Sequence, residues 1–154
     1  MIQNRQRGVR IPLQELRRFL ARAGRALRLR PQSVTVRLVS NAEIARWNRA
    51  YRGKPGATDV LSFPAARSLR DRTGRRSLRA FFASPPSPTP YLGDVAIAPD
   101  VARRNAARFG RTFSEEMRIL ILHGMLHLMG YDHETDNGQM ERRERKLRRH
   151  LGLA

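Results

Sequence analysis

Residues 123–133 read His123-Gly124-Met125-Leu126-His127-Leu128-Met129-Gly130-Tyr131-Asp132-His133 and hold three of the four histidines of the chain. The apolar run 117–129 around the first two contains no proline, and it predicts a helix. His123 and His127 are four residues apart, so their side chains project from one face of that helix. This spacing allows two imidazoles to bind the same metal ion.

Gly130 stands where this helix is expected to end, because glycine adopts the left-handed backbone of a helix terminus at little cost. A reversal of the chain there would bring His133 to the same ion. Three imidazoles with one open coordination position are typical of a catalytic zinc site. A single histidine in an apolar helix is more often a core residue, but three in this arrangement favour one zinc ion per chain.

The stretch is similar to the signature of the YbeY family, bacterial endoribonucleases of ribosomal RNA maturation. Two more stretches resemble the same family: Tyr51-Arg52-Gly53-Lys54 followed by Thr58-Asp59-Val60-Leu61-Ser62-Phe63-Pro64, and Leu92-Gly93-Asp94-Val95 with Ile97. Their order matches the family, and the resemblance covers about residues 34–150. It implies a sheet of about four strands with the metal helix packed against it.

Length and composition indicate one domain over residues 1–154 with a real hydrophobic core, since 40% of the residues are hydrophobic. No apolar run reaches the roughly 18–20 residues of a membrane span, and residues 1–10 lack the apolar segment of a secretory signal. We therefore expect a cytoplasmic protein with no membrane association. There is no cysteine, so a zinc site must use histidine or carboxylate ligands.

The formal net charge of +18 favours polyanionic partners, chiefly nucleic acid or an anionic membrane surface. Nearly all of this charge is arginine, because Lys54 and Lys146 are the only lysines. Heavy use of arginine can also reflect genome base composition. The charge supports RNA binding without establishing it.

Periodicity predicts the remaining elements. Strands are expected over residues 2–7, 34–38, 58–63 and 92–98, and helices over 12–29, 40–51, 99–109, 112–129 and 136–150. Because strands and helices interleave, we expect an α+β fold with α/β-like layers: a small mixed sheet of about four strands, about five helices, and the metal site on a central helix. Thr112 and Glu115 predict a capping box at the start of the metal helix. In the last helix, Glu144 and Arg148 are spaced as an ion pair.

Residues 65–90 differ from the rest in composition. They hold six arginines and end in Ser84-Pro85-Pro86-Ser87-Pro88-Thr89-Pro90. Proline at this density cannot join the interior of a sheet, so we expect an exposed basic insertion loop, longer than the connection in the family.

A three-histidine zinc ion can polarise a phosphoryl or a carbonyl oxygen and lower the pKa of bound water toward about 7. Either a phosphate ester or a carbonyl substrate could therefore be hydrolysed. The same histidine spacing occurs in metzincin proteases, which carry a glutamate directly after the first histidine. Here that position is Gly124, which has no side chain to act as a base. A phosphodiester instead needs a cationic group to stabilise its charge.

Arg52 is the candidate for that cationic group. Its match to the family stretch implies a place near the metal, and a guanidinium suits the paired oxygens of a phosphate. Lys54 is a second candidate for substrate binding. Asp94 or Asp132 could orient a ligand histidine, or either could cap a turn. Without the resemblance, Arg52 would be one exposed arginine among 29.

The function predicted from these patterns is a zinc-dependent endoribonuclease selective for single-stranded RNA. The resemblance implies 3′-end maturation of small-subunit ribosomal RNA and ribosome quality control, with ribosomal RNA and the ribosome as partners. One alternative is a metzincin-like zinc protease. Another is a non-enzymatic, zinc-stabilised module that binds ribosomal RNA, which a fourth protein ligand to the metal would favour. The oligomeric state stays open.

Overall fold

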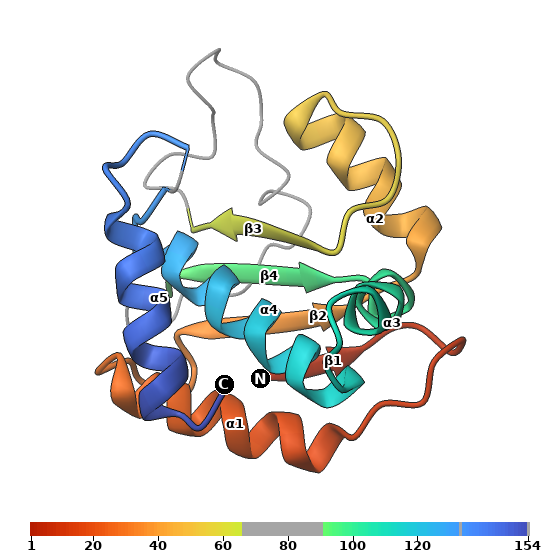
Figure 1. Cartoon of the computed structure of the whole chain (residues 1–154). Coiled ribbons are helices and arrows are strands. Elements are labelled where there is room, and N and C mark those ends of the chain that lie inside the picture. Colours follow the sequence, from red (N-terminus) through yellow and green to blue (C-terminus); the bar gives the residue numbers. More distant parts are fainter. Residues whose placement is uncertain (66–90, 133, 154) are drawn as a thin grey trace.

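The computed structural model describes residues 1–65, 91–132 and 134–153, in which strands and helices interleave (Figure 1). The strands are β1 (Ile2–Asn4), β2 (Val34–Leu38), β3 (Val60–Pro64) and β4 (Gly93–Ile97). The helices are α1 (Leu13–Ala26), α2 (Asn41–Trp47), α3 (Pro99–Arg108), α4 (Phe113–Leu128) and α5 (Gln139–His150), with a π-helical turn, η1 (Asn48–Arg52), directly after α2. The described residues thus confirm the predicted α+β fold.

The strands form one mixed sheet in the order β1-β2-β4-β3. Strands β1, β2 and β4 run parallel, whereas β3 runs antiparallel to β4, with Val60 opposite Ile97 and Pro64 opposite Gly93. Because β3 lies at the edge, its last residue can be a proline without breaking a ladder on both sides. This edge strand borders the candidate site described below.

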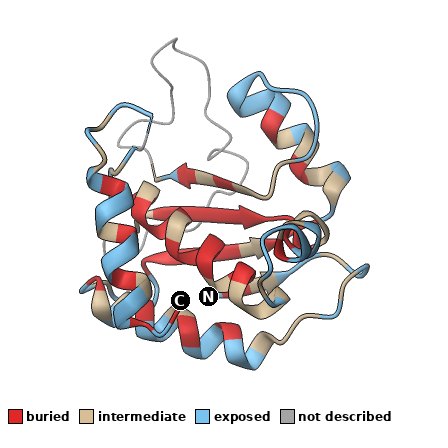
Figure 2. Cartoon of the chain, in the orientation of Figure 1, coloured by how far each residue is buried: buried red, intermediate tan, exposed pale blue. Residues whose placement is uncertain are grey.

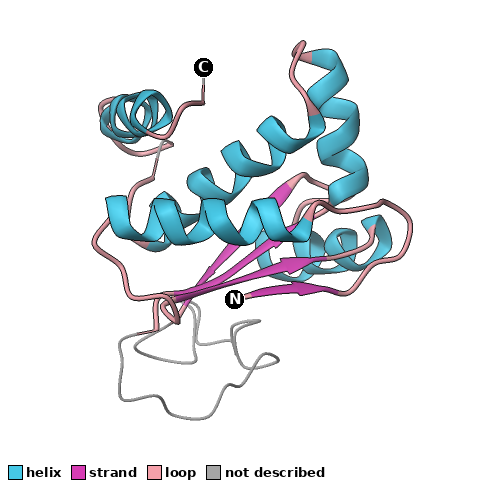
Figure 3. Ribbon diagram, turned by 90° about the horizontal axis from the view of Figure 1, so that it is seen from below, coloured by secondary structure: helices cyan, strands magenta, loops and turns pink. Residues whose placement is uncertain are grey.

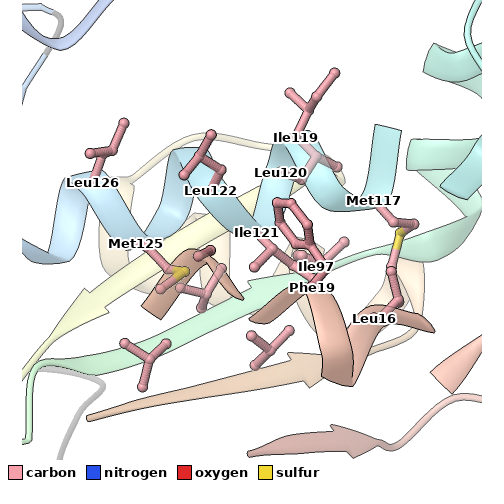
Figure 4. Close-up of a cluster of buried hydrophobic side chains, with 14 of the residues drawn as sticks. Leu16, Phe19, Ile97, Met117, Ile119, Leu120, Ile121, Leu122, Met125 and Leu126 are labelled. Carbon is pink, nitrogen blue, oxygen red and sulfur yellow. The ribbon is translucent and has the colours of Figure 1, made fainter. Parts of the chain in front are cut away.

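Helices α1 and α4 lie on the same side of the sheet (Figure 3). Alternate residues of β4, Val95 and Ile97, point to that side. They join a core made by Leu16 and Phe19 of α1 and by leucine, isoleucine and methionine side chains of α4 (Figure 4). The intervening Ala96 packs in a second, smaller cluster with Ile44 of α2 and Phe63 of β3. Burial is concentrated in the sheet and in α4, which identifies α4 as the central helix (Figure 2).

Both ends of α4 follow local rules of sequence. At its start, the Thr112 hydroxyl accepts from the Glu115 N–H at 3.1 Å and the Glu115 carboxylate accepts from the Thr112 N–H at 2.8 Å, which confirms the predicted capping box. The Thr112 backbone and hydroxyl lower the pKa of Glu115, so the box is strongest when this carboxyl is ionised. At the other end, Gly130 adopts φ 98° and donates to the His127 carbonyl, as predicted for a glycine-terminated helix.

Three expectations need correction or lie outside the described residues. The helix expected to reach Tyr51 ends at Trp47 and continues as η1. The last helix begins at Gln139, although Asp136 does accept hydrogen bonds near its start, from the N–H groups of Gly138 and Met140. The predicted insertion loop falls, except for its first residue, on residues 66–90, outside the described part of the chain.

No helix in the described ranges is long and apolar enough to cross a membrane.

Substituting Thr112 with alanine should destabilise the fold through α4. The substitution removes one acceptor of the capping box, which costs about 0.5–2 kcal/mol, or a fall in Tm of roughly 1–8 °C for a domain of this size. Thr112→Ser keeps the hydroxyl oxygen and is the matched control. Thermal unfolding measured above pH 6, where the Glu115 carboxyl is ionised, checks this; equal Tm values for the alanine and serine variants would contradict it.

Candidate active site

A cavity of about 570 Å³ lies where four parts of the chain meet: the C-terminal half of α4, the edge strand β3, the turn η1, and the residues Gly130, Tyr131, Asp132 and Glu134 that follow α4. Its walls include His123 and His127 from α4, Tyr51 and Arg52 from η1, and Glu134. Residues predicted separately from the first two family stretches therefore meet in one place. The lining residues come from two stretches that are far apart in sequence, one from Tyr51 to Pro64 and the other beginning at His123.

The two helix histidines face each other across one turn of α4. Their Nε2 atoms are 3.1 Å apart and their rings are inclined by 73°. Two nitrogens bound to one tetrahedral zinc ion at about 2.0–2.1 Å would be roughly 3.3 Å apart, so this pair has the separation that a shared ion requires. The third predicted ligand, His133, lies outside the described residues, and within them no third histidine, cysteine or carboxylate completes a metal-binding group.

The other ring nitrogen of His123 is held from α5. His123 Nδ1 lies 2.8 Å from Glu144 Oε2, and the second oxygen of Glu144 pairs with Arg148. Burial alone would raise the pKa of Glu144, but the hydrogen bond and charge of His123 and the charge of Arg148 hold its pKa below the usual value. Sequence spacing predicted the Glu144–Arg148 pair but not the contact with His123. The one available signal was a glutamate on the buried face of the last helix, between Met140 and Leu147.

Arg52 reaches the cavity because of an unusual local backbone. It ends η1, and π-helical turns shift the side chains that follow them and often occur at functional sites. The next residue, Gly53, has φ 67°, which only glycine adopts without strain. The side-chain amide of Asn48 donates to the Gly56 carbonyl at 3.0 Å and ties the end of the turn in place. The guanidinium of Arg52 lies 3.5 Å from a Glu134 carboxylate oxygen, and both side chains are exposed.

Of the remaining candidates, Asp132 lines the cavity, whereas Lys54 and Asp94 do not. Lys54 is exposed on the loop after η1 and is not among the described residues that line the cavity. Asp94 is fully buried, accepts from the Tyr91 hydroxyl at 2.6 Å and pairs with Arg37; it points to the sheet face opposite α4. The Asp132 carboxylate accepts from the Glu134 N–H, as a turn cap does. The carboxylate in contact with His123 is therefore that of Glu144, whereas Asp94 lies on the other face of the sheet.

Comparison with known proteins gives the site its context. The family model described as endoribonuclease YbeY matches residues 1–152. The chain belongs to the YbeY family. Among curated relatives, the endoribonuclease YbeY of Koribacter versatilis is 43% identical over 91% of this chain and 78% of its own length, and that of Nautilia profundicola is 38% identical over 81% and 76%. The solution structure of TM1509 from Thermotoga maritima is 26% identical, with a TM-score of 0.57, and the match covers 98% of this chain and 89% of that one.

Membership of the YbeY family confirms the resemblance and the prediction of an endoribonuclease. The structure adds a physical reason against the protease alternative. A Cβ atom at Gly124 would lie 2.5 Å from Val95 Cγ1, so position 124 faces β4 and not the cavity. A glutamate there could neither fit nor reach a substrate. In this chain, the residue after the first histidine serves helix packing.

Adding a methyl group at Gly124 should therefore destabilise the protein. We expect Gly124→Ala to cost about 1–3 kcal/mol from overpacking against Val95, a fall in Tm of roughly 2–12 °C. The matched control is Gly24→Ala in α1, where the nearest atom to the added Cβ would be the Leu29 carbonyl oxygen at 3.8 Å. That substitution should stabilise by about 0.5–1 kcal/mol, because alanine favours a helix over glycine. Thermal unfolding of both variants would reject the packing argument if Gly124→Ala matched or exceeded the wild type.

Proposed function

We propose that this member of the YbeY family is a zinc-dependent endoribonuclease that cuts single-stranded RNA, with ribosomal RNA as its substrate. The observation that carries the proposal is the convergence of His123, His127 and Arg52 on one cavity. Two histidine nitrogens at the separation of shared ligands support a metal ion, and a cationic side chain lining the same cavity supports a phosphate substrate. His133 is proposed as the third ligand.

A zinc ion held by these histidines would supply a Lewis acid and a bound water of lowered pKa. The protein itself contributes position and charge. His123 and His127 are held on a rigid, buried helix, which keeps both Nε2 atoms directed to one point. Arg52, which lines the same cavity, would bind the phosphate whose negative charge grows in the transition state. The exposed pair of Arg52 with Glu134 contributes little to stability, so a phosphate can replace the carboxylate.

Two further features support single-stranded RNA. Tyr51 lines the cavity beside Arg52 and is 40% exposed, and an aromatic side chain next to an arginine suits an unpaired base. The net charge of +18 favours association with a polyanion at a rate that falls with ionic strength. Ribosomal RNA, small-subunit 3′-end maturation and ribosome quality control follow from the likeness of the sequence stretches to the family.

Metal analysis tests the zinc part directly. Purified wild type should contain one zinc ion per chain, and His127→Ala should contain far less, because a two-ligand site binds zinc weakly. His150→Ala is the control: His150 is exposed at the end of α5, away from the cavity, and its loss should leave the zinc content unchanged. Equal zinc in wild type and His127→Ala would refute the assignment.

Arg52→Ala should lower the rate of RNA cleavage by about 10²–10³-fold, the usual effect of losing one preorganised contact to transition-state charge. Zinc content and Tm should stay near wild type, since Arg52 is exposed and its ion pair is weak. Arg52→Lys should restore the rate only in part, because lysine lacks the two-pronged geometry. The measurement is cleavage of a single-stranded RNA at fixed salt, with and without a chelator.

Arg49→Ala provides the matched control for this experiment. Arg49 is an exposed arginine on the same turn, η1, but it does not line the cavity. Its loss removes the same charge and should change cleavage by less than about threefold, as expected for a remote charge screened by salt. A duplex of the same sequence and a casein peptide run beside the RNA. Wild-type cleavage by Arg52→Ala, or cleavage of casein but not of RNA, would overturn the proposal.

A further inference from the structure

Helix α5 brings a buried carboxylate to the back of the histidine pair. Glu144 is 7% exposed and lies on the face of α5 that also buries Met140 and Leu147. From there its Oε2 atom reaches His123 Nδ1 at 2.8 Å. The opposite edge of the same ring carries the Nε2 atom that faces His127. One imidazole therefore connects a buried glutamate on α5 to the cavity.

Arg148 determines what Glu144 can do in this contact. Its guanidinium pairs with Oε1 from one turn further along α5, so both carboxylate oxygens are engaged by nitrogen groups. A carboxylate held in this way accepts hydrogen bonds and has no proton to donate. His123 must then carry its ring proton on Nδ1, so that Nε2 is the unprotonated nitrogen, the form in which it can bind a metal ion.

From this geometry we infer that Glu144 is a positioning residue that holds His123 in the Nδ1–H tautomer and turns its Nε2 atom toward the cavity. Carboxylates that accept from the second nitrogen of a ligand histidine commonly serve this purpose and raise its affinity for metal. The inference rests on the proposed zinc site for its consequence in metal binding. The tautomer itself is a property of the protein without metal.

The chain offers a closely matched control in Glu141. It lies on the same helix one turn earlier and also pairs with an arginine four residues later, Arg145. Its side chain is 71% exposed, and no hydrogen bond or ion pair links it to His123 among the described residues. Replacing Glu141 therefore removes an equal charge and an equal helix pair while leaving the histidine contact intact.

The first experiment measures zinc affinity by competition with a chromophoric chelator. We expect Glu144→Ala to bind zinc about 10–100-fold more weakly than wild type, and Glu141→Ala to bind within about twofold of it. Glu144→Gln should fall between them. An amide oxygen turned to His123 leaves the amide NH₂ facing Arg148, whereas the reverse orientation donates to Nδ1 and favours the wrong tautomer. The glutamine variant keeps the test usable if the alanine variant does not fold.

The second experiment reads the tautomer itself in the metal-free protein. Long-range ¹⁵N–¹H spectra show which ring nitrogen carries the proton, and the signals of His123 are identified by their loss in His123→Asn. Wild type and Glu141→Ala should show the Nδ1–H form; Glu144→Ala should show the Nε2–H form. A merely structural role for Glu144 would lower Tm and leave the tautomer unchanged, which would overturn the inference, as would equal zinc affinity in Glu144→Ala and wild type. Absence of zinc from the wild type would instead count against the proposed function, and the spectra would still decide the role of Glu144.

Discussion

The close packing of α4 on β4 at Gly124 is the constraint on which the site depends. With no side chain at this position, the helix can lie directly on Val95, where any Cβ would collide. That contact sets the depth and rotation of α4, because neighbouring residues on a helix are separated by a fixed angle. His123 and His127 consequently point along the sheet toward its β3 edge and not into the core. The absence of a side chain at Gly124 therefore has two effects. It leaves position 124 without a catalytic base, and it places the two histidines.

The edge of the sheet supplies the second half of the cavity. Among the residues that the structure describes, the antiparallel edge strand β3 pairs with β4 alone, and residues of β3 line the cavity. The segment that precedes it, η1, packs on the other face of the sheet through Tyr51, whose ring lies 5.0 Å from that of Phe63. Arg52, the next residue and the last of the π-helical turn, lines the cavity. Two layers of the fold thus meet at the edge where the substrate is proposed to bind.

Interactions between residues close together in the sequence were predicted, and those between distant residues were not. The capping box of α4, the glycine that ends it and the strands β2 and β4 depend on residues at most a few positions apart, and all were predicted. The ending of α2 was not, because an α-helix and a π-turn share the same local preferences and differ in tertiary contacts. The contact between Glu144 and His123 joins residues 21 positions apart and depends on how α5 docks. Spacing showed the partner of Glu144 on its own helix, Arg148, but not the one across the interface.

The ion pairs around the cavity differ in burial, and that difference separates their roles. Glu144 and His123 are mostly buried, with side-chain exposures of 9% and 26%, so their contact is shielded from water and salt. Arg52 and Glu134 are 37% and 60% exposed, and their 3.5 Å contact is correspondingly weak. The buried environment suits Glu144, which is proposed to hold His123 in one orientation. The phosphate contact proposed for Arg52 needs the exposed environment, since a strong resident partner would compete with the substrate. The two contacts therefore suit different proposed tasks: the buried one on α4 and α5 would hold a histidine in one orientation, and the exposed one would release a cationic side chain to a substrate phosphate.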